Sequence, residues 1–322
     1  MIGWGPKSRS VILVTGAPRS GTTPVGVTLS HAPGACLIYE PWGVVTGDRR
    51  FRTAFPIPGT DGFNHEDIAR FLEDLGGLRL CLKSQRRPSH ASEPFYRQWL
   101  LKVTGSRALH SLRLARLNPF CRQIIWKDPF AVLAVPDILQ CGIPVVVTVR
   151  PPLAHAASYK RLGWRAQLKT IYPRFAERYG GDPLIDDLLT RPTLGAVETA
   201  AAFWRMASGV IATVVDAPGL HIINSSDLEE DETAVYERLF RKLGLRFDRA
   251  RAYLLKRLEK ARAQNRDGKV VHDWSRSVGY TNSYWQTVLS AEEVSRVEAL
   301  TGDVELAMKA SGGATREADF GG

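Results

Sequence analysis

Residues 11–23, with the sequence VILVTGAPRSGTT, constrain the fold more than any other stretch of the chain. The run Val11–Val14 is short, apolar and rich in β-branched side chains, which is typical of a buried strand in a parallel sheet. A turn with Gly16 and Gly21 follows, and the apolar segment after it predicts a helix. Glycines let such a turn curl tightly, so that its backbone N–H groups and those of the first helical turn point at an anion. The stretch therefore predicts an α/β fold with a phosphate-binding turn.

The glycine spacing is that of a Walker loop, GxxxxGK[ST], but the cation is displaced. Thr22 follows Gly21 where a Walker loop has lysine, and Arg19 lies three residues before Thr22. Kinases and ATPases use the missing lysine on the transferred phosphoryl group. We therefore expect this P-loop-like turn to hold a phosphate without splitting ATP. Two alternatives remain, namely an ordinary glycine turn between a strand and a helix, and a small-molecule kinase.

The motif PRSGTT after an N-terminal strand resembles the 5′-phosphosulfate loop of sulfotransferases that use 3′-phosphoadenosine-5′-phosphosulfate (PAPS). Its arginine is similar to that of tyrosylprotein sulfotransferases and of a large bacterial sulfotransferase family. The resemblance implies that PAPS is the cofactor and that adenosine 3′,5′-bisphosphate (PAP) is the product. It assigns cofactor binding to six consecutive residues of the turn: Pro18, Arg19, Ser20, Gly21, Thr22 and Thr23.

Short apolar runs alternate with helical patterns along the chain. Further strands are predicted at residues 35–39, 122–126, 145–149 and 220–223. This alternation indicates a doubly wound, three-layer α/β fold with a central parallel sheet. With 322 residues, of which 44% are hydrophobic, the chain can form one domain over 1–322. We expect helical insertions at about 45–120 and 160–215, and a flexible tail at about 311–322.

A second candidate phosphate site follows the strand VVVTV. Arg150 ends this strand, Pro151 and Pro152 favour the start of a helix, and Ser158 lies about two turns into it. A guanidinium and a hydroxyl on one side of such a corner can hold a phosphate together. Sulfotransferases bind the 3′-phosphate of PAPS with this arrangement. ATP has no 3′-phosphate, so a kinase has no use for a second site.

Two further stretches are similar to the same families. The segment IIWKDPF resembles the KDPF segment of tyrosylprotein sulfotransferases, and residues 224–245 resemble a C-terminal element in which Ser226 stands where a glutamate is usual. Arg276 and Ser277 look like part of a bacterial C-terminal segment, with the spacing shifted by a residue. The resemblance implies that these two residues also bind the cofactor.

Sulfuryl transfer to an alcohol requires a base, because an alcohol is a poor nucleophile near neutral pH. Glu40 is the candidate, since it follows a predicted strand next to the phosphate loop and stands at the EP position of related enzymes. Beyond the carboxyl ends of parallel strands lies the usual ligand crevice. The alternatives are a structural, salt-bridged Glu40 and a catalytic His31.

The leaving phosphate oxygen gains negative charge, so donors aimed at it lower the barrier by about 2–4 kcal/mol each. The candidate donors are Arg19, Lys127 and the hydroxyls of Thr22 and Thr23. Alternatively, Lys127 pairs with its neighbour Asp128 or with another carboxylate. No cluster of carboxylates in the sequence suggests a bound magnesium ion, so we expect no metal.

The net charge of +10 favours anionic partners, which include nucleotides, nucleic acids and acidic substrates. A nucleic-acid-binding protein remains the alternative of another class, although it leaves Arg19 and Arg150 unexplained and no known nucleic-acid module is present. No run approaches the ~18 apolar residues of a membrane helix, so we expect a soluble, cytoplasmic protein. The expected acceptor is a hydroxyl of a carbohydrate or glycolipid, with a peptide tyrosine as the second choice.

Overall fold

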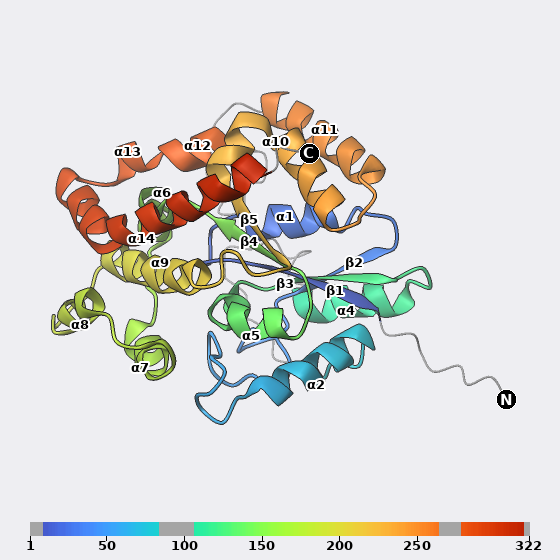
Figure 1. Cartoon of the computed structure of the whole chain (residues 1–322), viewed down its shortest axis with the longest axis horizontal. Coiled ribbons are helices and arrows are strands. Elements are labelled where there is room, and N and C mark those ends of the chain that lie inside the picture. The colour runs from blue at the N-terminus through green and yellow to red at the C-terminus, as the bar shows by residue number, and fades with distance from the viewer. Residues whose placement is uncertain (1–8, 84–105, 264–277, 319–322) are drawn as a thin grey trace, which may run out of the picture.

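The computed structural model describes residues 9–83, 106–263 and 278–318. Five strands form one parallel sheet in the order β2-β3-β1-β4-β5 (Figure 1). The strands are β1 (Ser10–Thr15), β2 (Ala35–Tyr39), β3 (Gln123–Lys127), β4 (Val145–Val149) and β5 (Leu220–Asn224). Each lies at a predicted position, and the predicted three-layer α/β fold is confirmed.

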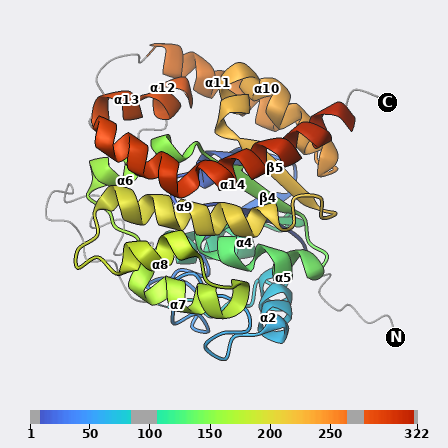
Figure 2. The ribbon, with the colours of Figure 1, turned by 60° about the vertical axis from the view of Figure 1, so that its left-hand side comes forward.

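Helices cover both faces of the sheet and extend beyond its carboxyl edge (Figure 1). They are α1 (Thr22–Leu29), α2 (His65–Gly76), α4 (Arg107–Leu117), the 3₁₀ helix η1 (Pro129–Ala134), α5 (Val135–Gln140), α6 (Pro152–Leu162), α7 (Leu168–Tyr179), α8 (Pro183–Leu189), α9 (Ala196–Ala212), α10 (Ser225–Lys242), α11 (Asp248–Ala263), α12 (Val278–Ser283), α13 (Trp285–Val288) and α14 (Ala291–Ala318). Helices α9 and α14 run side by side in front of the sheet in Figure 2.

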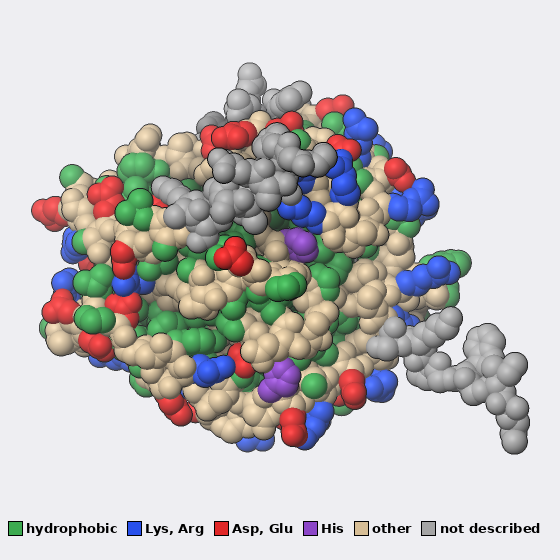
Figure 3. All heavy atoms as spheres, in the orientation of Figure 1, with side chains coloured by type: hydrophobic (Ala, Val, Ile, Leu, Met, Phe, Trp, Pro, Cys, Tyr) green, Lys and Arg blue, Asp and Glu red, His purple; other side chains and the backbone are tan. Residues whose placement is uncertain are grey.

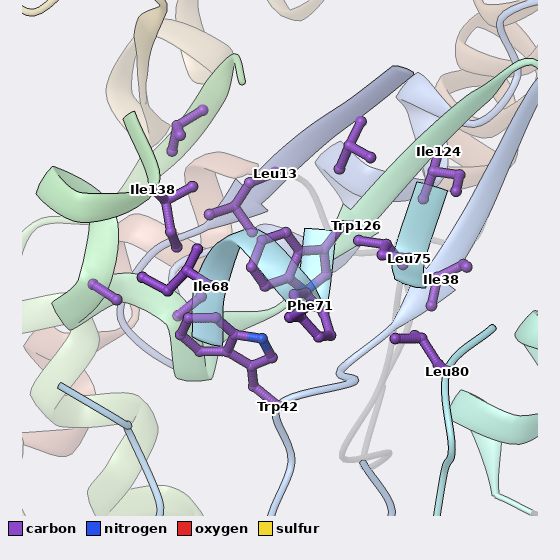
Figure 4. Packing of buried hydrophobic residues seen from close by; sticks show 14 of the residues in the cluster. Leu13, Ile38, Trp42, Ile68, Phe71, Leu75, Leu80, Ile124, Trp126 and Ile138 are labelled. Carbon is purple, nitrogen blue, oxygen red and sulfur yellow. The ribbon is translucent and has the colours of Figure 1, made fainter. Parts of the chain in front are cut away.

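The alternation of side chains along β1 divides the core into two layers. Leu13 packs with residues of α2, α4 and α5, whereas Ile12 and Val14 pack with residues of α1, α10 and α11. In the first layer, Trp42 and Trp126 are fully buried with ring centroids 5.2 Å apart (Figure 4). Because a strand has a period of two, one apolar run supplies both layers.

Capping residues fix the starts of two helices. The Asn64 side chain accepts a hydrogen bond from the N–H of Asp67 at the start of α2, and Ser290 accepts from the N–H of Glu293 at the start of α14. In both cases the acidic side chain bonds back to the capping N–H, which completes a capping box.

Some element bounds differ from expectation. Within the helical insertion predicted at about 45–120, α4 begins at Arg107, and residues 84–105 lie outside the described ranges. Helix α14 reaches Ala318, so it includes most of the segment that we predicted as a flexible tail. Within the described ranges, no helix has the length and apolar character needed to cross a membrane.

Candidate active site

The turn between β1 and α1 has the tight backbone that its glycines predict. Gly16 has φ 145°, and a Cβ atom at this position would lie 2.3 Å from the carbonyl oxygen of Thr148. Gly21 has φ 100° and caps α1 without a side-chain hydrogen bond. The first N–H groups of α1 therefore remain available to an anion. The Ser20 hydroxyl is buried and lies 2.7 Å from that of Thr148, which ties the turn to β4.

Arg19 reaches from this turn to the second predicted corner. Its φ is 76°, a left-handed conformation that is uncommon for a residue with a side chain. The Arg19 Nε donates to the Ser158 hydroxyl of α6 at 3.2 Å. Arg150 Nη1 in turn donates to the Arg19 carbonyl oxygen at 3.3 Å. The structure therefore brings together Arg19, Arg150 and Ser158. Arg19 is more than 130 residues away in the sequence from each of the other two.

Arg150 is held by its surroundings at the end of β4 and is only 7% exposed. Its Nη2 donates to the carbonyl oxygen of Thr281, and its own carbonyl accepts from Trp204 Nε1 at 2.8 Å. The Nε atom is buried and has no hydrogen-bond partner among the described residues. Burial, together with the charges of Arg19 and Arg161, lowers the pKa of Arg150 to about 10, although Tyr284 opposes this shift.

Three arginines thus form what we call the arginine corner: Arg19, Arg150 and Arg161. The guanidinium carbons of Arg150 and Arg161 each lie 5.5 Å from the ring centre of Tyr284. Among the described residues, no carboxylate forms an ion pair with any of the three. Such a concentration of positive charge attracts an anion strongly.

His155 lies within this positive environment, fully buried on α6. Its ring packs against that of Tyr159 at a centroid distance of 4.9 Å. Burial, followed by the charges of Arg150 and Arg19, lowers the pKa of His155 to about 3. The imidazole is therefore neutral at physiological pH and adds no charge to the arginine corner.

Glu40 and Lys127 form an ion pair at the carboxyl ends of β2 and β3. The parallel register places Tyr39 opposite Lys127, so Glu40 follows directly beside the lysine. Lys127 Nζ donates to Glu40 Oε1 at 2.5 Å, and the Glu40 backbone N–H donates to the Lys127 carbonyl at 2.8 Å. The Lys127 side chain is 4% exposed and that of Glu40 is 31% exposed, so the carboxylate faces the solvent side. Lys127 thus pairs with a carboxylate other than Asp128.

Asp128 instead anchors the chain around this pair. Its carboxylate accepts from the N–H of Trp42 at 2.7 Å, from Trp126 Nε1 at 3.2 Å and from the N–H of Phe130 at 3.0 Å. Burial raises the pKa of Asp128 to about 7, although the hydrogen bond from Trp42 opposes this shift. The loop after Glu40 is consequently fixed to the end of β3. The sequence did not reveal this role of Asp128.

The remaining predicted residues have different outcomes. Pro18, Thr22 and Thr23 lie in the β1–α1 turn or the first turn of α1. Arg276 and Ser277 lie outside the described residues. Arg161 was missed, although it lies one helical turn after Ser158 on α6 and so shares its side of the helix.

His31 does not lie at the candidate site. It follows the C-terminal end of α1, whereas the phosphate-binding turn precedes the N-terminal end of this helix. Its Nδ1 lies 2.8 Å from the carbonyl oxygen of Val27, and its ring stacks on Tyr253 at a centroid distance of 3.9 Å. These contacts give His31 a packing role, and we do not retain it as an alternative base.

No protein-family model matches the chain, and no curated protein matches it. Among solved structures, the chain is similar to several sulfotransferases. The sulfotransferase domain of the Synechococcus PCC 7002 olefin synthase is 16% identical, with a TM-score of 0.40 over 93% of this chain and 98% of that one. Sulfotransferase STF9 of Mycobacterium avium is 13% identical, with a TM-score of 0.42 over 93% of this chain and 76% of that one.

A third structure, retinol dehydratase in complex with retinol and PAP, is 12% identical, with a TM-score of 0.45 over 93% of this chain and 82% of that one. We base the function proposed below on the residues of this chain.

Proposed function

We propose that the protein is a PAPS-dependent sulfotransferase that transfers a sulfuryl group to an acceptor hydroxyl. The observation that carries this proposal is the meeting of two strand-to-helix corners, one after β1 and one after β4. Arg19 contacts Ser158, and Arg150 contacts the backbone of Arg19. A ligand with two phosphates on one ribose can therefore contact both corners at once.

The residues of the arginine corner fit such a ligand. The Arg150 Nε is buried without a partner among the described residues, and a buried donor is costly to leave unpaired. A phosphate oxygen would supply the missing acceptor. The N-terminus of α1 carries no side-chain cap, and the turn before it offers N–H groups to a second phosphate. Under this proposal, Arg150 and Ser158 hold the 3′-phosphate, and residues 18–23 hold the 5′-phosphosulfate.

When bound, PAPS supplies the sulfuryl group, whose bond to the 5′-phosphate oxygen breaks as a bond to the acceptor oxygen forms. Glu40 takes the proton of the acceptor hydroxyl, for which its partial exposure gives access. Once protonated, Glu40 holds Lys127 less strongly, because the negative charge of the pair is gone. Lys127 and Arg19 then donate to the phosphate oxygen on which negative charge develops.

We propose a hydroxyl of a carbohydrate or glycolipid as the acceptor, with a peptide tyrosine as the second choice. The first choice follows from the basic and aromatic character of residues 160–181, which contain exposed Arg161 and Trp164. The second follows from the resemblance of residues 127–130 to the KDPF segment of tyrosylprotein sulfotransferases.

Thermal-shift measurements with PAP, ATP and a DNA oligonucleotide test the cofactor assignment. We expect PAP to raise the melting temperature more than ATP does, because only PAP places a phosphate at Arg150. Stabilisation by ATP alone would support a kinase, and stabilisation by DNA alone would support a nucleic-acid-binding protein. Either result would contradict the proposal. Transfer of labelled sulfate from PAPS to a panel of hydroxyl acceptors then tests the activity itself.

A further inference from the structure

A cavity of about 300 Å³ lies between β2 and α4. β2 is an edge strand of the sheet, and α4 runs beside it in the opposite direction. The Tyr39 backbone N–H donates to Ser111 Oγ at 3.1 Å, and Asn118 Nδ2 donates to Cys36 Sγ at 3.4 Å. The start of α4, with Arg107, therefore lies beside the C-terminal end of β2.

One residue of the cavity wall, Tyr39, lies near Lys127 of the Glu40–Lys127 pair. Tyr39 lines the cavity, and its ring centre lies 5.9 Å from Lys127 Nζ. Burial raises the pKa of Tyr39, the charge of Arg107 lowers it, and the charge of Glu40 raises it. Tyr39 is consequently a wall shared by the cavity and the proposed base.

Polarity changes along the cavity. Arg107 and His110 line the end near Tyr39, whereas the rest is lined mainly by Cys36, Leu37, Leu114 and Ala115. Ser111 and Asn118 also line this part, and both side chains already form hydrogen bonds within the protein. Beyond this part the apolar surface continues, with Leu114 55%, Leu117 79% and Phe120 72% exposed. Hydrophobic side chains protrude at the right-hand edge of Figure 3, where the connection between α4 and β3 lies in Figure 1.

We propose that this cavity binds the apolar body of the acceptor, and that the acceptor is an amphiphilic alcohol or phenol whose hydroxyl reaches Glu40. This inference rests on the proposed function and narrows its acceptor class. A free sugar has hydroxyls on all sides, and the apolar part of the cavity would leave them without partners. An alkyl or aromatic body instead removes apolar surface from water on both itself and the cavity wall. Arg107 and His110 meet the polar end of such a molecule.

A series of 4-alkylphenols tests the match between acceptor and cavity. Sulfate transfer from PAPS is measured for 4-ethylphenol, 4-butylphenol and 4-hexylphenol, with glucose as the polar comparison. We expect kcat/KM to rise about fourfold per added CH₂ until the cavity is filled, because burying one CH₂ is worth about 0.8 kcal/mol. Glucose should be a poor acceptor.

The variant Leu114→Glu places a charge in the apolar part of the cavity. We expect it to lower kcat/KM for 4-hexylphenol at least tenfold and to leave the thermal shift by PAP unchanged. Leu184→Glu is the matched control, because Leu184 is 41% exposed on α8, far from α4 in Figure 1, and should leave both quantities unchanged.

The outcomes separate this inference from the proposed function. The inference is overturned if glucose is sulfated and kcat/KM does not depend on the alkyl length of the phenols, or if Leu114→Glu is fully active on 4-hexylphenol. In either case the sulfotransferase assignment stands. Failure of PAP to stabilise the protein, together with no transfer to any acceptor, overturns the proposed function and the inference with it.

Discussion

The arginine corner and the Glu40–Lys127 pair differ in how their positive charges are neutralised. At the arginine corner, no described carboxylate pairs with Arg19, Arg150 or Arg161, and their guanidiniums meet a hydroxyl, carbonyls and aromatic rings. At the other end, a carboxylate lies 2.5 Å from the ammonium of Lys127.

This difference indicates that the arginine corner is the part suited to bind a charged ligand. Clustered arginines raise the free energy of the protein through mutual repulsion, and a bound polyanion relieves that repulsion. The Glu40–Lys127 pair needs no anion, because its charges cancel. It is instead suited to exchanging a proton, since protonation of the carboxylate changes the charge that Lys127 experiences. Under the proposed function, the arginine corner binds the cofactor and the Glu40–Lys127 pair exchanges the proton.

The largest expected effect comes from breaking the proton-transfer end. Glu40→Gln keeps the size of the side chain but removes its ability to accept a proton. We expect kcat to fall by about 10²–10⁴, the range that general bases contribute. The affinity for PAP, measured by calorimetry, should stay near that of the wild type. A variant with wild-type kcat would show that another group is the base.

Removing a cation from the arginine corner should weaken the binding of PAP rather than lower kcat. Arg150→Ala should raise the Kd of PAP about 10- to 100-fold, because hydrogen bonds to charged groups are worth about 1.5–3 kcal/mol. Arg241→Ala is the control, since Arg241 is exposed on α10 away from the corner. An unchanged PAP titration for Arg150→Ala would show that the 3′-phosphate binds elsewhere.

The Glu40–Lys127 end also contains a titrating group that the arginine corner lacks, namely the carboxyl of Asp128. Burial raises its pKa from 3.8 to about 7, so the folded protein keeps a proton that the unfolded chain releases. The free energy of unfolding should consequently fall as pH rises from about 4 to about 7, by up to about 1.4 kcal/mol per pH unit.

The variant Asp128→Asn cannot titrate, and its stability should lack this component. Denaturant unfolding of both proteins between pH 4.5 and 7.5 measures the difference. Parallel stability curves for the two proteins would exclude a raised pKa at Asp128. The absolute stability of the variant does not enter the comparison, because only the two slopes are compared.

The smallest effect is expected at the hydroxyl of the arginine corner. Ser158→Ala removes the acceptor of the Arg19 Nε hydrogen bond and one donor to the proposed phosphate. Ser158 is uncharged and offers one hydrogen bond, whereas Arg150 offers a full charge and several donors, so the Kd of PAP should rise only about 2- to 10-fold. If Ser158→Ala raised the Kd of PAP more than Arg150→Ala does, the hydroxyl would contribute more to PAP binding than the charge, contrary to this prediction.

Much of the fold follows from local sequence, because β-branched runs and glycine turns act over a few residues. β2 (Ala35–Tyr39) and β4 (Val145–Val149) have the predicted bounds. Helix α12 (Val278–Ser283) was missed, because its six residues are too few to show an apolar period.

The site was predictable as a set of residues but not as a set of contacts. The motifs singled out Glu40 and Lys127 separately. Their pairing depends on the register between β2 and β3, which are separated by more than 80 residues and meet only in the folded sheet. Tyr284 gave no sequence signal, because its place between Arg150 and Arg161 is set by the packing of α12 and α13 against α6.

The close contact between α1 and β3 places Gly26, a residue without a side chain, against Lys127. A Cβ atom at Gly26 would lie 3.1 Å from both Cβ and Cγ of Lys127, so α1 confines the aliphatic stem of the lysine. A methyl group added at Gly26 must push that stem aside and change the reach of its ammonium. Under the proposed function, a substitution at Gly26 on α1 would therefore change the reaction rate while leaving every reacting group chemically unchanged.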